Sequence, residues 1–225
     1  ESRNAEARLR LFMFPYSGAG ASVWRQWPDA LAPQIDVVTV QLPGRETRLR
    51  EPPANHFDMV LPSINALIDE RHDLPFALMG HSMGAHLAFA VMVSRAEQHK
   101  TLPAHVILSG RRPVHIGEQP TLSHLPDEQF LDVIRPRHGS AELDEGLMRF
   151  MLPTLKADLQ MTESWRVPEV HQYPVLATVI GALDDDWVPS NTLGRWYDYF
   201  QNEEEPRLFK GDHFFLLHAV DTLSA

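Results

Sequence analysis

The sequence predicts an α/β protein with a mostly parallel β-sheet flanked by helices, and two features of the chain indicate this class. Short runs rich in Val, Ile, Leu and Phe recur along the 225 residues. Most of them are continuously apolar, as is typical of strands buried on both faces of a parallel sheet. Helical patterns separate the runs, and this alternation favours right-handed crossovers between parallel strands. The expected strands are residues 9–14, 37–42, 76–80, 105–109, 175–180 and 207–209.

Two of the intervening segments show clear helical character. Val60, Ile64, Leu67 and Ile68 share one face at helical spacing. Residues 85–93 are apolar nearly all round, which is typical of a helix that packs against a sheet.

The stretch from about residue 112 to residue 167 interrupts the alternation of strands and helices. It contains no clear strand, but helical patterns occur at 127–134 and 146–161. A connection of this length exceeds the roughly 15 residues beyond which structureless loops become uncommon. We therefore expect a helical cap, or lid, inserted at about 112–167 into a single domain that spans residues 1–225.

Composition narrows the possible functions. The formal net charge of −10 argues against nucleic acid as the main partner, because phosphate binding needs basic patches. No apolar run reaches the roughly 18 residues that a membrane span needs, and the polar N-terminus does not resemble a signal peptide, so we expect a cytoplasmic protein without a membrane partner. The chain has no Cys, which excludes disulfides, thiolate metal ligands and a cysteine nucleophile. We expect no metal and no cofactor.

The clearest chemical motif is Gly80-His81-Ser82-Met83-Gly84, which follows an apolar run and precedes a helical one. A G-x-S-x-G pattern in this context is typical of the sharp strand-to-helix turn that exposes the nucleophilic serine of an α/β hydrolase. The flanking glycines leave room for that turn. The motif therefore predicts an α/β-hydrolase fold with Ser82 as catalytic nucleophile, the alternative being a tight structural turn.

A serine hydroxyl needs a base to take its proton. In this fold the chain order is nucleophile, acid, histidine, and this order removes most of the twelve histidines. Only His213 and His218 follow an acid placed after residues 175–180. His213 directly follows the last expected strand, so it is the predicted catalytic base, and His218 is expected to face the core or solvent.

The acid should follow residues 175–180, where three aspartates occur in succession. A carboxylate at this position would hold the imidazole of the base in the correct tautomer. We favour Asp185 as the catalytic acid and keep Asp184 as the alternative. The remaining aspartates are expected to be solvated loop residues or helix caps.

An oxyanion hole needs backbone N–H donors, typically two. Met83 should supply one, because it begins the helix after Ser82, where the helix dipole adds positive potential. The glycine-rich loop of residues 15–20 should supply the other, and Ser17 is the expected donor. The loop lacks the Gly-Lys-Ser/Thr ending of a phosphate-binding loop and is no dinucleotide fingerprint.

With these motifs placed, the chain resembles the type II thioesterases that accompany nonribosomal peptide and polyketide synthases. The resemblance extends from Leu11 to about Leu217. The segments that carry it are Phe14-Pro15-Tyr16-Ser17-Gly18-Ala19-Gly20, Gln41-Leu42-Pro43-Gly44-Arg45-Glu46, Gly80-His81-Ser82-Met83-Gly84-Ala85, Ser109-Gly110-Arg111-Arg112-Pro113 and Gly211-Asp212-His213-Phe214-Phe215. In similar enzymes the acid usually lies in Gly-Gly-x-x-Asp, which matches Gly181 to Asp185 with Ala182 in place of the second glycine.

The resemblance implies a thioesterase that hydrolyses acyl groups from the phosphopantetheine arm of acyl or peptidyl carrier proteins, and so removes stalled or mis-primed units during antibiotic biosynthesis. Tyr16, Met148 and Met151 are the expected substrate-binding residues. Met148, Met151 and Met161 would line an adaptable apolar pocket in the cap or, on the alternative interpretation, pack the cap against the core.

Three arginines are candidates for contact with the acidic carrier or the pantetheine phosphate, and a solvated surface position is the alternative for each: Arg45, Arg111 and Arg112.

Two other functions remain open at this stage. A generic small-molecule serine esterase or acyltransferase would use the same three side chains and show no preference for carrier-bound substrate. A non-catalytic binding module would keep the pocket but would not be labelled at Ser82 by a fluorophosphonate.

Overall fold

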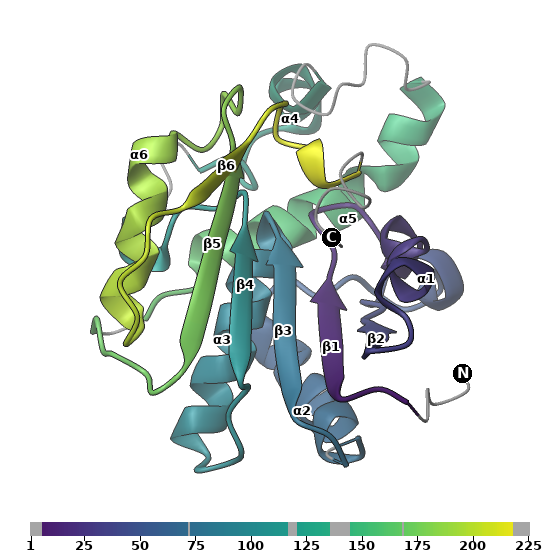
Figure 1. Cartoon of the computed structure of the whole chain (residues 1–225). Helices are drawn as coiled ribbons and strands as arrows, with labels where there is room; N and C mark the ends of the chain where they lie inside the picture. The colour runs from purple at the N-terminus through teal and green to yellow at the C-terminus, as the bar shows by residue number, and fades with distance from the viewer. Residues whose placement is uncertain (1–5, 72, 117–120, 136–144, 168, 218–225) are drawn as a thin grey trace.

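The computed structural model describes residues 6–71, 73–116, 121–135, 145–167 and 169–217. Within these residues the chain forms a six-stranded sheet of order β2-β1-β3-β4-β5-β6, in which all neighbouring strands are parallel (Figure 1). The predicted α/β fold with a parallel sheet is thereby confirmed. The strands are β1 (Leu9–Phe14), β2 (Ile35–Thr39), β3 (Phe76–His81), β4 (His105–Ser109), β5 (Leu176–Ala182) and β6 (Arg207–Phe209).

Strand β2 lies at the edge of the sheet and is displaced from the predicted range of 37–42. It begins at Ile35, because Ile35 and Asp36 already pair with β1. Arg10 of β1 donates from Nε to Oδ2 of Asp36 at 2.8 Å, so a charged residue is accommodated at this edge. The apolar run alone missed this start, because the charge at Asp36 interrupts the hydrophobic pattern.

Strand β5 differs from the predicted range of 175–180 in the other direction, because it is shifted toward the C-terminus. Gly181 and Ala182 pair with Leu208 and Phe209 of β6, which extends the strand by two residues. The short strand β6 therefore determines where β5 ends.

Helices cover both faces of the sheet. The α-helices are α1 (Trp27–Leu31), α2 (Leu61–Asp69), α3 (Met83–Glu97), α4 (Asp127–Ile134), α5 (Glu145–Ser164) and α6 (Ser190–Leu193). Short 3₁₀ helices are η1 (Ala21–Trp24), η2 (Glu46–Arg48), η3 (Phe57–Met59), η4 (Val114–Ile116), η7 (Gly194–Tyr199) and η8 (Phe215–Leu217). Among the described residues, no helix combines the length and the apolarity that a membrane crossing requires.

Two apolar cores result from the alternation of side chains along the strands. Phe12 and Phe14 of β1 point into the larger core, which contains α2 and α3, whereas Leu11 and Met13 point into the smaller core on the opposite face. The smaller core includes Trp24 and Trp27, the first residue of α1. The sheet is therefore covered on both faces, as its continuously apolar strands require.

The chain between β4 and β5 forms the two helices predicted for the cap. Helix α4 has the predicted bounds, and α5 runs from Glu145 to Ser164, longer than the predicted 146–161. The two helices share a third apolar cluster of their own, in which Phe130 is fully buried. In Figure 1, α4 lies beyond the ends toward which the strand arrows point. The carboxyl ends of parallel strands are where open α/β sheets bind ligands.

Candidate active site

Ser82 occupies the turn between the end of β3 and the start of α3. Its backbone has φ of 54° and ψ of −118°, a conformation that non-glycine residues rarely adopt. The turn is possible because Gly84 has no side chain: a Cβ there would overlap the carbonyl oxygen of Phe14 at the end of β1. The amide of Ser82 donates to the carbonyl oxygen of Ser109 at 2.8 Å, which joins the turn to the end of β4.

Three side chains from three separate segments form one hydrogen-bonded chain. Nε2 of His213 lies 3.0 Å from Oγ of Ser82, and Nδ1 of His213 lies 2.7 Å from Oδ2 of Asp185. Because a carboxylate only accepts hydrogen bonds, Nδ1 carries the proton of the neutral ring, and Nε2 is left to accept the proton of the serine hydroxyl. The imidazole is buried, with 4% of its surface exposed. The arrangement has the geometry of a nucleophile, a base and an orienting acid.

The two candidate acids lie in different surroundings. The side chain of Asp185 is buried and its Oδ1 accepts the backbone amides of Trp187 and Val188 at 2.9 and 3.1 Å, which directs Oδ2 toward His213. Asp184 is exposed and its Oδ2 accepts the amide of Gly211 at 3.3 Å. The structure therefore brings Asp185, rather than Asp184, to His213.

Aromatic groups enclose the imidazole. The ring of Trp187 stacks on His213 with centroids 4.6 Å apart and planes inclined by 27°. Phe214 contacts the same imidazole edge-to-face at 5.4 Å. These rings limit the access of water to the hydrogen bond between His213 and Asp185. His218, the other histidine considered as base, lies outside the described residues.

The two expected oxyanion donors flank the serine. Met83 is the first residue of α3, so its amide belongs to the unsatisfied first turn of the helix. Ser17 lies in the loop after β1 and lines the same cavity as Ser82. The structure brings both residues to the region of Ser82.

A cavity of about 310 Å³ opens at Ser82 and His213. Its wall combines polar groups with apolar side chains from α5 and from the loop after β5. Among the lining residues are Tyr16, Ser17, Arg111, Arg112, Leu155, Leu159, Glu163 and Trp187.

A second cavity of about 820 Å³ is lined by all of residues 16–20 and shares Tyr16, Ser17 and Phe214 with the first. Ser82 does not line this larger cavity, so the smaller one contains the reactive group.

The expected substrate-binding residues are placed differently from one another. Tyr16 lines both cavities, and its ring packs against Phe214 at 5.2 Å. Met151 lines the larger cavity only. Met148 is buried in the apolar cluster shared by α4 and α5 and lines neither cavity, and Met161 lies in the main core. The structure thus brings Tyr16 to the site of Ser82 but does not bring the methionines there.

Arg45 corrects an expectation from the sequence. The side chain of Arg45 is neither solvated nor placed for contact with a carrier. It is 5% exposed and forms a bidentate ion pair with the buried Asp158 of α5. Arg111 and Arg112 line the cavity at Ser82. Burial, followed by the charge of Arg112, lowers the pKa of Arg111 to about 9, so this guanidinium still carries its charge at neutral pH.

Sequence reasoning missed three residues of this region: Asp158, Glu163 and Trp187. Glu163 of α5 accepts the amide of Leu122 at 2.6 Å and so ties α5 to the segment before α4. A signal for Asp158 existed, because it is an acid between Leu155 and Leu159 on the apolar face of a predicted helix. Trp187 has no comparable signal, since its stacking depends on how two loops meet.

In the part of the chain that the structure describes, no three His, Asp or Glu side chains are grouped so that they could hold a metal ion.

The parallel sheet, the strained serine turn after β3 and the histidine after the last strand define the class as an α/β hydrolase. The thioesterase domain family matches residues 9–224. The gramicidin S biosynthesis protein GrsT of Aneurinibacillus migulanus is 33% identical over 217 residues, which cover 95% of this chain and 85% of the relative.

Solved structures agree with this match. The RedJ thioesterase of the prodiginine pathway of Streptomyces coelicolor superposes with a TM-score of 0.90 at 31% identity, covering 98% of this chain and 91% of that chain. The type II thioesterase BorB from the borrelidin biosynthetic cluster gives a TM-score of 0.86 at 28% identity, covering 99% and 94%. The chain belongs to the thioesterase domain family and is a hydrolase of thioesters.

Proposed function

We propose that this thioesterase removes acyl groups from the phosphopantetheine arm of carrier proteins, and so clears stalled or mis-primed units from a peptide or polyketide synthase. The observation that carries the proposal is the hydrogen-bonded chain from Asp185 through His213 to Ser82 at the wall of a cavity. The names of GrsT and BorB, which refer to gramicidin S and borrelidin biosynthesis, support the choice of pathway.

The reaction proceeds through an acyl-enzyme. Oγ of Ser82 attacks the thioester carbonyl carbon while Nε2 of His213 takes the hydroxyl proton. Asp185 holds the ring in the tautomer that this transfer requires and stabilises the imidazolium that forms. The amides of Ser17 and Met83 donate to the oxyanion. The tetrahedral intermediate then collapses and the C–S bond breaks.

The leaving group suits this site. The departing thiolate accepts a proton from His213, and a thiol with a pKa of about 8.5 needs less assistance than an amine would. Water then enters, His213 removes one of its protons, and the resulting hydroxide attacks the acyl-enzyme carbonyl. Collapse of the second intermediate returns the proton to Oγ of Ser82 and releases the free acid.

The cap and the cavity wall would select the substrate. In the proposed single domain, α4 and α5 form the cap, and Leu155 and Leu159 of α5 provide apolar surface for the acyl chain. Arg111 and Arg112 place positive charge on the wall of the same cavity, in a chain whose formal net charge is −10. Anionic or strongly polar groups of the substrate would be attracted to this part of the wall.

The test is release of free acid from an acyl-phosphopantetheinyl carrier protein, with wild type compared with Ser82→Ala. We expect rapid release by wild type, and a loss of activity in the variant on the order of 10⁴-fold or more, because the nucleophile is absent. A matched oxygen ester of the same acyl group is the control substrate.

The competing function is a general serine esterase with the same three side chains. It predicts that the oxygen ester is hydrolysed as fast as the carrier-bound thioester. Equal rates on the two substrates would contradict the carrier-directed proposal.

A further inference from the structure

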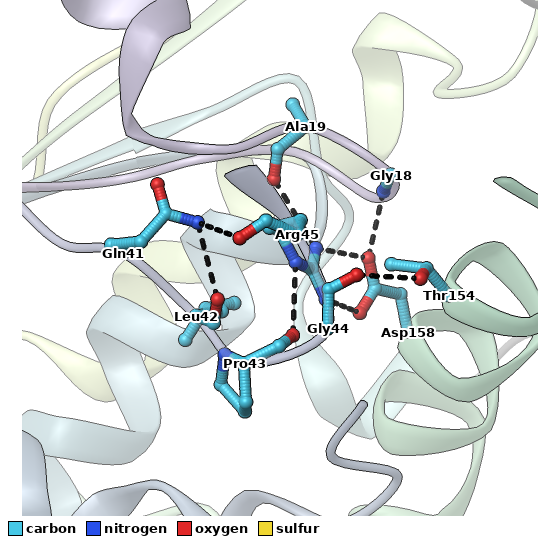
Figure 2. Close-up of polar contacts among 9 residues, drawn as sticks. All are labelled: Gly18, Ala19, Gln41, Leu42, Pro43, Gly44, Arg45, Thr154 and Asp158. Atoms are coloured by element: carbon cyan, nitrogen blue, oxygen red, sulfur yellow. Dashed lines mark hydrogen bonds and ion pairs between the residues drawn. The ribbon is translucent and has the colours of Figure 1, made fainter. Parts of the chain in front are cut away.

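The buried ion pair between Arg45 and Asp158 connects three segments that are distant in sequence. Both terminal nitrogens of the guanidinium donate to the carboxylate: Nη1 lies 2.7 Å from Oδ2 and Nη2 lies 2.7 Å from Oδ1. Arg45 is 5% exposed and Asp158 is fully buried. Figure 2 shows the pair between the loop after β1, the loop after β2 and helix α5.

Burial of two charges costs several kcal/mol of desolvation free energy, so a buried ion pair is weak evidence for stability. Its additional contacts indicate what else it does. Oδ2 of Asp158 accepts the backbone amide of Gly18 at 2.7 Å. Nη1 of Arg45 donates to the carbonyl oxygen of Ala19 at 3.2 Å. The pair thus binds the backbone of Gly18 and Ala19, the two residues that directly follow Ser17.

The loop itself is a tight turn with a defined geometry. The amide of Ala19 donates to the carbonyl oxygen of Tyr16 at 3.1 Å, and Gly18 has φ of +80°. A hydrogen bond across four residues with a positive φ at the third is typical of a type II turn. The soft motion of such a turn is a flip of its central peptide, here the peptide between Ser17 and Gly18. The bond from Gly18 to Asp158 opposes that flip.

The direction of the Ser17 amide follows from the same turn. In a trans peptide the N–H and the preceding C=O point in opposite directions. Because the carbonyl oxygen of Tyr16 points into the turn toward Ala19, the N–H of Ser17 points away from the turn. Ser17 also lines the cavity at Ser82. Any loss of the turn would therefore move this amide relative to the serine.

The remaining contacts tie the turn to the cap helix. Oγ1 of Thr154, one turn before Asp158 on α5, donates to the carbonyl oxygen of Gly44 at 3.1 Å. A Cβ on Gly18 would lie 2.6 Å from Cδ2 of Leu155 of α5, so the turn packs directly on this helix. Figure 2 shows Gly18, Gly44 and Thr154 around the pair.

We propose that Arg45 and Asp158 are positioning residues, which hold the turn of residues 16–19 and so aim the Ser17 amide at the oxyanion. The position of that amide then depends on how α5 packs against the turn. The proposal rests on the proposed function for the role of Ser17. Neither residue touches the substrate; they act through the backbone of the turn.

The experiment compares Asp158→Asn and the double variant R45M/D158L with wild type. Asp158→Asn removes the negative charge of this side chain and weakens its hydrogen bond with the amide of Gly18. The double variant replaces the buried pair by apolar groups, which often restores or raises stability. Asp36→Asn is the matched control, because Asp36 pairs with the buried Arg10 near the opposite ends of the strands.

We expect kcat for the acyl-carrier substrate to fall about ten- to a hundredfold in both pair variants, while KM changes less than about threefold, because misplacement of an oxyanion donor acts on the transition state. The rate of Ser82 labelling by a fluorophosphonate should fall in parallel, since its transition state also develops charge on oxygen. The double variant should keep an unfolding midpoint close to that of wild type. Asp36→Asn should lower the unfolding midpoint and leave kcat and the labelling rate unchanged.

Unchanged kcat and labelling rates in folded pair variants would overturn the proposal and leave the pair a purely structural contact. The labelling rate separates this failure from that of the proposed function. If wild type is labelled at Ser82 but releases no acyl group from the carrier, the proposed function fails. Slower labelling of the pair variants would in that case still support their role in positioning.

Discussion

At the scale of single residues, the two neighbouring acids after β5 differ in what their carboxylates contact. Asp185 is held by two backbone amides and reaches the imidazole, whereas Asp184 is exposed and contacts the backbone of Gly211. A carboxylate fixed in this way maintains the Nδ1–H tautomer of His213, which leaves Nε2 free to accept the proton of Ser82. The difference between the two acids is thus one of direction and burial.

This difference predicts that two isosteric substitutions lower kcat to very different extents. Asp185→Asn should lower kcat on the order of 10⁴-fold, because the amide can present its NH₂ group to the ring and stabilise the wrong tautomer. Asp184→Asn should keep kcat within about threefold of wild type, as a surface change does. Single-turnover release of the acyl group from the carrier measures both. A comparable loss in Asp184→Asn would contradict the assignment of Asp185 as the acid.

At the scale of elements, the turn between β3 and α3 depends on close packing of backbone against backbone. Gly84 lies in the first turn of α3, against the carbonyl oxygen of Phe14. Helix α3 can approach β1 this closely only because no side chain intervenes. The same approach fixes where Ser82 stands relative to the loop of residues 15–20.

Gly84→Ala should therefore lower the free energy of unfolding by more than about 2 kcal/mol, since the added methyl group meets backbone that cannot move aside. Gly194→Ala is the matched control. Gly194 has φ of −58°, and an added Cβ would find its nearest neighbour, Cδ of Pro206, at 3.9 Å. That variant should be neutral or stabilised by up to about 1 kcal/mol, because Ala restricts the unfolded chain. Urea unfolding of the two variants gives the comparison, and equal losses would argue against the packing explanation.

At the scale of the whole molecule, buried histidines make stability depend on pH. Burial, followed by the charge of His213, lowers the pKa of His81 well below its usual value. Burial, followed by the charge of Arg111, does the same for the pKa of His86 on α3. The neutral ring of His86 has a hydrogen-bond partner, because Nε2 lies 2.9 Å from the carbonyl oxygen of Arg112.

The sign of the effect follows from linkage. Below the unfolded-state pKa of about 6.5, the unfolded chain binds protons that the folded chain excludes at these two histidines, so the free energy of unfolding falls as the pH falls. The loss reaches up to about 1.4 kcal/mol per pH unit for each histidine until the folded pKa is approached. Urea unfolding at pH 7 and pH 5 measures it. His86→Gln should show a smaller decrease than wild type, and an identical pH dependence in the two proteins would refute the role of His86.

Much of the fold could be read from short segments of the chain. Short apolar runs, most of them continuous, identified all the strands of the described sheet, and the cap helices fell within a few residues of their predicted bounds. Boundaries failed where a partner strand decides them, as at Asp36 in β2 and Ala182 in β5. Within the candidate site, the G-x-S-x-G motif pointed to Ser82, and chain order pointed to His213 and the group of aspartates. Met148 and Met161 pack in apolar clusters, as the alternative interpretation expected, and Met151 lines the larger cavity rather than the one at Ser82.

Local sequence specifies the alternation of strands and helices and the positions of the sharp turns at Ser82 and after β1, because a pattern of neighbouring residues marks each of them. The choice between Asp184 and Asp185 and the burial of Arg45 against Asp158 depend on where segments far apart in the chain approach one another. Arg45 and Asp158 are separated by 113 positions, and no local pattern encodes that they meet. Only the packing of α5 against the carboxyl ends of the strands brings the two charges together, and desolvation then requires that they pair.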